Sequence, residues 1–258
     1  MKTLTLCALL LPIAALADSP FDGTWVSRED TAVMDKKPYD ISLAKGTWHN
    51  KSAVPPVTVK ADGTDQPVKG HTYFDTLAVH ETGADSVETT AKKTGKVIGT
   101  STYTVSADGK TLTRKWTDTT GTAPASGEAI FERVGKAPAG AHAISGSWKA
   151  VKMQNLSASA KTVTFKGTAD GLSMTNQTGQ SYDAKFDGKQ VAMAGDPGAT
   201  MVSLKKVNDH TIVETDHRKG KVVEVDTMTV SADGKTLKVD WDDKETGRKG
   251  TVTMEKSP

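Results

Sequence analysis

Apolar and polar residues alternate along most of the chain with a period of two, which is the pattern of half-buried β-strands. Tyr103 and Val105 alternate with threonine and serine, and a few residues later Arg114 and Trp116 take alternate positions in the same way. The Ala-Asp-Gly-Lys segment between these runs predicts a hairpin turn, in which Gly109 supplies the positive φ angle. Turn signals recur about every 8 to 12 residues, and no stretch shows a helical apolar stripe, so the chain is predicted to be all-β.

The pattern occurs twice because the chain contains an internal repeat. Residues 102–112 read TYTVSADGKTL and residues 227–237 read TMTVSADGKTL, so Gly234 is the counterpart of Gly109 in the turn. The period of 125 residues is far longer than that of a solenoid or propeller, so each copy is long enough to form a domain. Glycine, proline and alanine between the copies are typical of a linker. The predicted divisions are a first copy at 18–134, a linker at 135–143 and a second copy at 144–258.

Each copy opens on a Gly-x-Trp sequence, which contains Trp25 in the first copy and Trp148 in the second. Each closes on a strand with a basic residue near its end, Arg133 or Lys256. This combination resembles the lipocalins and fatty-acid-binding proteins, up-and-down β-barrels in which the tryptophan packs at the closed end near the basic side chain. The chain also resembles a group of exported bacterial proteins with two tandem lipocalin-like, calycin-type units, a resemblance that implies no activity.

We therefore expect two tandem up-and-down antiparallel β-barrels of lipocalin-like type, with β-sandwiches as the alternative. A closed barrel leaves no exposed strand edge, and an eight-stranded barrel either holds one small ligand or is filled by its own side chains. The paired tryptophans are expected to be structural. Trp25 and Trp148 should lie at corresponding barrel ends, and Trp116 and Trp241 on corresponding strands.

Residues 1–17 have the features of a secretory signal, which are Lys2, an apolar stretch and an A-x-A site at 15–17. The only cysteine, Cys7, lies inside this segment, so a mature chain would contain no thiolate for a disulfide, a metal or a nucleophile. The 33 basic and 31 acidic residues nearly balance, and no basic stripe with interleaved aromatic residues points to nucleic acid. No later apolar run is long enough to span a membrane. We expect a soluble exported protein, periplasmic or extracellular.

Familiar catalytic motifs are absent from the sequence. It contains no nucleophile elbow, no complete phosphate-binding loop, no helical zinc motif and no calcium-loop ladder. We therefore predict no cofactor and no catalytic residue, and expect a non-catalytic protein that binds a small, partly apolar ligand in one or both barrels. The alternatives are an envelope interaction or structural protein with filled barrels and, third, an enzyme with an unrecognised site. The interior volume separates the first two.

The strongest candidate for a ligand contact is Arg114. With Tyr103 and Trp116 it is expected to face the interior of copy one, where copy two has apolar residues beside Trp241. A buried guanidinium is costly unless it is paired, and its planar fork binds a carboxylate well. Fatty-acid-binding proteins bury arginine and tyrosine to hold a carboxylate, and this pair resembles them in residue type. The alternative is that Arg114 reaches water at the strand end or pairs with a nearby acid.

Copy two contains a candidate cation site of four carboxylates, Glu214, Asp216, Glu224 and Asp226. If the turn between their strands has three residues, Glu214 lies opposite Glu224 and the four groups converge. Opposed like charges are destabilising unless they are neutralised, and hard cations such as calcium prefer oxygen ligands. The alternative is a solvated face neutralised by Lys and Arg, or a register that separates the pairs.

A third candidate belongs to copy one alone. His71, Tyr73 and Asp75 share strand parity and could line a barrel mouth together as a metal site or an acid–base pair. The alternative is a polar loop in which Tyr73 is half-buried.

Overall fold

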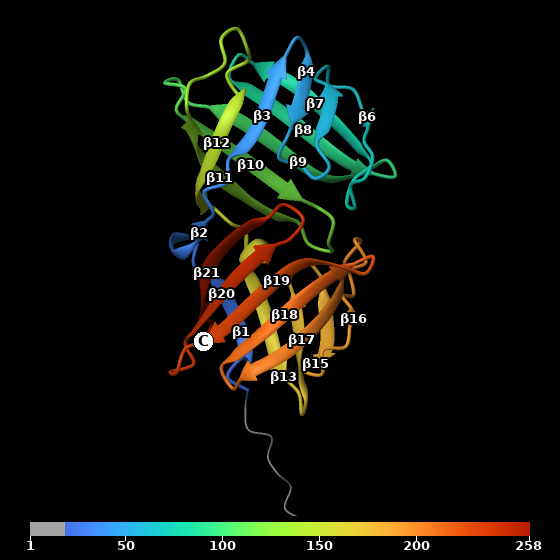
Figure 1. Cartoon of the computed structure of the whole chain (residues 1–258), viewed down its shortest axis with the longest axis vertical. Helices are drawn as coiled ribbons and strands as arrows, with labels where there is room; N and C mark the ends of the chain where they lie inside the picture. The colour runs from blue at the N-terminus through green and yellow to red at the C-terminus, as the bar shows by residue number, and fades with distance from the viewer. Residues whose placement is uncertain (1–18) are drawn as a thin grey trace, which may run out of the picture.

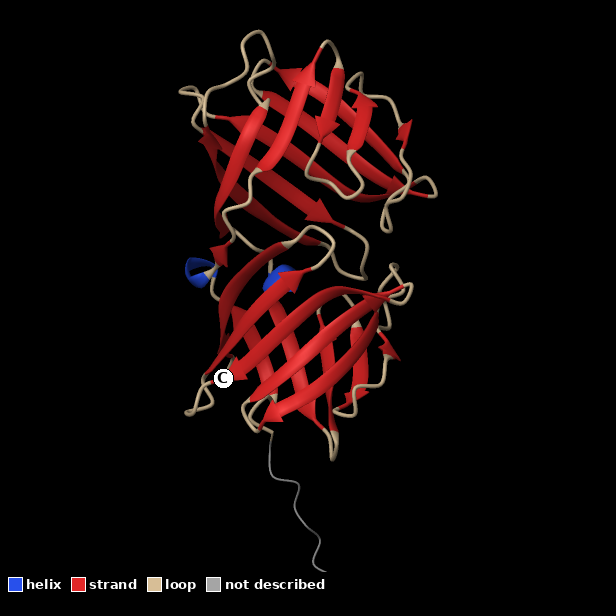
Figure 2. Cartoon of the chain, in the orientation of Figure 1, coloured by secondary structure: helices blue, strands red, loops and turns tan. Residues whose placement is uncertain are grey.

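The computed structural model describes residues 19–258 and shows an all-β chain folded into two nearly closed antiparallel barrels in tandem (Figure 1). This architecture confirms the predicted fold class, excludes the β-sandwich alternative and is consistent with lipocalin-like units. The predicted signal at 1–17 lies outside the described residues. Figure 2 shows that strands form both bodies and that the helical turns lie at the junction between them.

Barrel one consists of β3 (Tyr39–Ala44), β4 (Thr47–Asn50), β5 (Val57–Lys60), β6 (Gln66–Pro67), β7 (Thr76–Gly83), β8 (Ser86–Lys93), β9 (Lys96–Val105), β10 (Thr111–Asp118), β11 (Ala125–Val134) and β12 (Gly146–Gln154). Barrel two consists of β1 (Gly23–Ser27), β13 (Thr162–Gly167), β14 (Gly171–Asn176), β15 (Ser181–Lys185), β16 (Val191–Ala192), β17 (Met201–Asn208), β18 (Thr211–Arg218), β19 (Lys221–Val230), β20 (Thr236–Asp243) and β21 (Arg248–Lys256). The remaining elements are η1 (Glu29–Thr31), β2 (Val33–Met34), which pairs with β21, and α1 (Ala158–Lys161).

The two repeats exchange their opening strands. β1 of the first repeat lies between β13 and β21, where Trp25 pairs with Val163 and Lys256. β12 of the second repeat lies between β3 and β11 in barrel one. Figure 1 shows the blue β1 among the yellow to red strands of the lower barrel. The barrels therefore do not coincide with the segments 18–134 and 144–258, because the 135–143 connection joins β11 to β12 as antiparallel neighbours, the local pairing that sequential strands favour.

Each exchanged strand carries a tryptophan that lies in the core of the barrel it joins. Trp25 and Trp148 are fully buried, and their indole N–H groups donate to the Phe21 and Ile144 carbonyls, each at 2.8 Å. The Arg133 guanidinium carbon lies 4.0 Å from the centre of the Trp148 ring. In barrel two the corresponding cation is an amine, Lys256 Nζ, which lies 5.4 Å from the Trp25 ring. Arg133 and Lys256 thus each lie against the tryptophan of the other repeat.

Two glycine pairs explain local features of the sheets. Gly109 and Gly234 have φ angles of 72° and 69° in the corresponding hairpin turns, a conformation that L side chains rarely adopt. Gly127 and its counterpart Gly250 each lie opposite a tryptophan on the neighbouring strand. A Cβ at Gly127 would lie 3.0 Å from the Trp116 ring, so the absence of a side chain lets the indole lie against the strand.

The junction between the barrels is formed by loops from both. The Thr122 amide donates to the Thr178 carbonyl at 2.7 Å, and the Glu29 carboxylate accepts from the amides of Asn155 and Leu156 at 2.9 Å each. In residues 19–258, none of the helical segments has the length and apolar character needed to cross a membrane.

Candidate functional site

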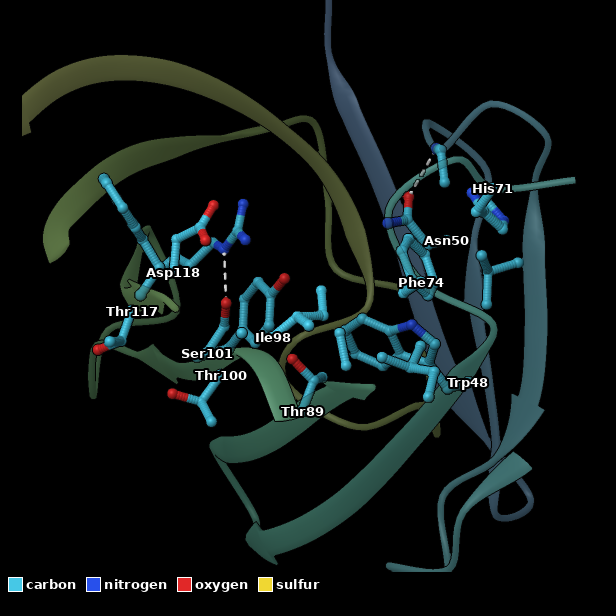
Figure 3. Close-up of a pocket in the computed structure, with 18 of the residues that line it drawn as sticks. Trp48, Asn50, His71, Phe74, Thr89, Ile98, Thr100, Ser101, Thr117 and Asp118 are labelled. Atoms are coloured by element: carbon cyan, nitrogen blue, oxygen red, sulfur yellow. Dashed lines mark hydrogen bonds between the residues drawn. The ribbon is translucent and has the colours of Figure 1, made fainter. Parts of the chain in front are cut away.

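Barrel one contains a cavity of about 410 Å³ that is partly open to solvent, a volume in the usual range of small-molecule sites, about 300 to 1,000 Å³. Its apolar wall includes Trp48, Val57, Phe74, Leu77, Ile98 and Trp116. Its polar wall includes Tyr39, Asn50, His71, Ser101, Tyr103 and Arg114. Figure 3 shows the rings of Trp48 and Phe74 on the side opposite Ser101 and Asp118. The cavity is therefore amphiphilic rather than uniformly apolar.

Arg114 is the cationic group of this cavity. It lies on β10 opposite Tyr103 of β9, and its guanidinium carbon is 5.7 Å from the centre of the Tyr103 ring. Its Nε donates to Ser101 Oγ at 3.1 Å, the dashed line to Ser101 in Figure 3. Arg114 forms no ion pair with any residue of 19–258, and its two terminal nitrogens make no hydrogen bond there. A partly buried guanidinium without a counterion is costly, so an anionic ligand would stabilise it.

Two tyrosines extend this donor group. Burial, with Tyr103 as a neighbour, raises the pKa of Tyr39 well above its ordinary value, so the phenol stays neutral. Tyr39 accepts a hydrogen bond from Asn50 Nδ2 at 2.8 Å, and the Tyr103 hydroxyl is its second polar neighbour. Tyr103 is 4% exposed, and its ring lies 5.7 Å from that of Trp48. The arrangement can therefore hold an anion at Arg114 and an apolar group against the aromatic wall.

The three residues expected inside copy one, Tyr103, Arg114 and Trp116, do line one cavity. Sequence reasoning missed the opposite wall, which comes from β3, β4 and the loop before β7. Tyr39 shares strand parity with Ile41, which is buried, and this parity was a usable signal that Tyr39 faces the interior. His71 and Phe74 lie on a loop without periodicity, so no pattern indicated that their rings stack inside the barrel at 4.4 Å.

The structure separates His71, Tyr73 and Asp75. His71 lines the cavity, and burial lowers its pKa, which favours the neutral ring. Tyr73 instead reaches barrel two, where its ring lies 5.2 Å from the Arg218 guanidinium carbon. The Asp75 carboxylate accepts from the Thr94 amide at 2.9 Å. The predicted grouping is therefore wrong, because all three residues lie on an irregular loop that ends before β7 begins at Thr76.

The four carboxylates of copy two do converge inside barrel two, in a register different from the expected one. Glu214 lies opposite Asp226, and Asp216 opposite Glu224. The expected three-residue turn is wrong, because Arg218 pairs with Lys221 across a two-residue turn and a bulge shifts the register beyond Asp216. Their counterparts in the first repeat all line the cavity of barrel one: Thr89, Ala91, Gly99 and Ser101. The two interiors thus differ in chemistry at equivalent positions.

Burial makes these carboxyl groups weak acids. Burial and, to a lesser degree, the neighbouring carboxylates raise the pKa of Glu214 to about 8, of Asp216 to about 7 and of Asp226 to about 9. The Tyr182 hydroxyl donates to Glu214 at 2.5 Å, and one oxygen each of Asp216 and Asp226 is buried without a partner. Protonated carboxyl groups are poor cation ligands. In the described part of the chain, no group of three or more His, Cys, Asp or Glu side chains has the geometry to hold a metal ion.

Comparison with protein-family models and with curated proteins finds no match to this chain. The geometry of the barrel interiors is therefore the basis for assigning a function.

Proposed function

We propose that the protein is an exported, non-catalytic binding protein of lipocalin-like type, which holds a small, partly apolar molecule with a carboxylate or similar anion in barrel one. The observation that carries this proposal is the guanidinium of Arg114, which lines a cavity of about 410 Å³ and has no ion pair within residues 19–258. Export rests on the signal pattern of residues 1–17, and corresponds to a periplasmic or extracellular location.

The binding mode follows from the two walls of the cavity. The anion would accept hydrogen bonds from the terminal nitrogens of Arg114, with the neutral phenol of Tyr39 as a further donor. The apolar part would lie against Trp48, Phe74 and Leu77 across the cavity. A cavity of this size also favours ligand binding over the alternative of an envelope protein with filled barrels, because a filled barrel one would leave no such volume.

Substitution of Arg114 tests the proposal. Displacement of a fluorescent fatty-acid probe by decanoate is measured for the native protein, Arg114→Met and Arg114→Lys. We expect Arg114→Met to weaken decanoate binding about 10- to 100-fold, the range for losing a hydrogen bond between charged groups. The lysine variant should lie between, because it keeps the charge and loses the planar fork.

The matched control is Lys115→Met, which removes a cation from the adjacent position on the outer face of the same strand, where the side chain is 68% exposed. We expect this variant to bind decanoate as the native protein does. Equal affinity in the native protein and both Arg114 variants would remove Arg114 from ligand binding and overturn the proposal.

A further inference from the structure

A polar groove of about 260 Å³ lies at the junction of the two barrels. Barrel one supplies Trp116, Asp118 and Thr120 to its lining, and barrel two supplies Asn176, Thr178 and Gln180. No lysine or arginine lines it. The groove therefore differs in chemistry from the cationic cavity of barrel one.

The groove continues the cavity. Trp116 and Asp118 line both. Arg114 bonds to Ser101, whose register partner on β10 is Trp116, so the guanidinium leans along the strand toward the groove. Residues on one face of a strand follow each other at about 7 Å. An anion at Arg114 would thus lie within one or two such steps of the groove.

Among the described residues, the groove contains both hydrogen-bond donors and hydrogen-bond acceptors that have no partner. Asn176 Nδ2 donates to Gln180 Oε1 at 2.9 Å, and the side-chain Nε2 of Gln180 has no partner among the described residues. The indole N–H of Trp116 also has none there. One Asp118 oxygen accepts from the amide and the hydroxyl of Thr120, and the other accepts from no group in residues 19–258. Donors and acceptors next to an aromatic ring suit hydroxyl groups, since each hydroxyl both donates and accepts.

We propose that this groove is a second subsite, which holds a neutral group with several hydroxyls, such as a sugar ring, attached close to the anionic group of the ligand in barrel one. The inference rests on the proposed function, because the anion at Arg114 sets the distance to the groove. With this subsite, residues of both barrels would form the binding site.

The test compares two acids that differ only in the sugar, 3-hydroxydecanoate and 3-(β-D-glucosyloxy)decanoate, by isothermal titration calorimetry of the whole protein. We expect the glucoside to bind the native protein about 10-fold more tightly, the effect of one or two added net hydrogen bonds. Gln180→Ala should lose this gain and bind 3-hydroxydecanoate unchanged. Gln180→Glu should lose it too, although it keeps the oxygen that accepts from Asn176 and therefore the loop.

The control Gln66→Ala changes the same residue type on β6, away from the groove, and should keep the gain. If the glucoside binds the native protein no better than 3-hydroxydecanoate, or if both Gln180 variants keep the gain, the groove is not a sugar subsite and the cavity proposal stands. If neither acid binds, the proposed function fails and the subsite fails with it.

Discussion

Single residues give the two barrels opposite interiors. Arg114, the cation in barrel one, has an apolar counterpart in Val239, and Ser101, which bonds to Arg114, has a carboxyl counterpart in Asp226. The same framework therefore positions a guanidinium in one interior and weak acids in the other. This difference has a consequence for stability, because buried carboxyl groups couple folding to pH.

The pKa of Glu214 is raised from an ordinary value near 4.5 to about 8 in the folded protein, so the folded state binds a proton that the unfolded state releases. The stabilising effect is complete below pH 4.5 and is lost as the pH rises through 8. We predict that the free energy of unfolding falls between pH 5 and pH 9, and that Glu214→Gln reduces this fall by about 1.4 kcal/mol per unit of pKa difference removed. Urea unfolding of the native protein and of Glu214→Gln at several pH values from 5 to 9 measures the free energy of unfolding.

Asp240→Asn serves as the control for this prediction. Asp240 lies in the same barrel, but its bond to Lys238 lowers its pKa, so its contribution to stability changes only in acid. An alkaline fall of the same size in the native protein and in Glu214→Gln would show that Glu214 is not protonated in the folded state.

At the level of elements, local features could be predicted and strand partnership could not. The hairpin around Gly109 and the inward positions of Tyr103 and Arg114 follow from period-two alternation and one turn, which involve only neighbouring residues. The exchange of β1 and β12 could not be foreseen, because the Trp25 and Trp148 strands share the Gly-x-Trp sequence by which each copy opens. Which of these two strands joins which barrel depends on the chain segments that connect them to their neighbours. The loop part of the far wall, His71 and Phe74, could not be predicted either, since a loop carries no sequence period.

The exchange determines which barrel each tryptophan stabilises. We predict that Trp148→Ala destabilises barrel one by about 3 to 5 kcal/mol, the usual effect of truncating a buried aromatic residue, although Trp148 belongs to the second repeat. Trp25→Ala should destabilise barrel two by a similar amount. Hydrogen exchange measured peptide by peptide shows which barrel each substitution destabilises. Faster exchange in β17–β20 rather than β7–β10 for Trp148→Ala would contradict the observed pairing.

At the level of the whole molecule, barrel one is an insertion in barrel two. All its strands lie in the continuous segment 39–154, whereas barrel two is assembled from β1 and β13–β21. The end of β1 adjoins the start of β13, because Val26 pairs with Thr162. A two-residue turn can therefore join these strands as a hairpin.

We predict that replacing residues 28–160 by Asn-Gly gives an isolated barrel two that melts cooperatively, and that the fragment 36–157 forms barrel one alone and retains decanoate binding. Circular dichroism melts and probe displacement check the two proteins. Non-cooperative melting of the 36–157 fragment would show that barrel one depends on contacts across the junction, such as that between Thr122 and Thr178.

The exchange also gives assembly an order in time. A ribosome makes about 5 to 20 residues per second, so roughly 10 to 50 seconds separate the synthesis of β1 from that of its last partner, β21. When β11 emerges, β1 is already present and β12 is not. The edge that β12 finally occupies is thus first within reach of β1, a strand with the same Gly-x-Trp sequence that belongs to barrel two. Native pairing is reached only when the later strand takes that edge and leaves the earlier one for barrel two.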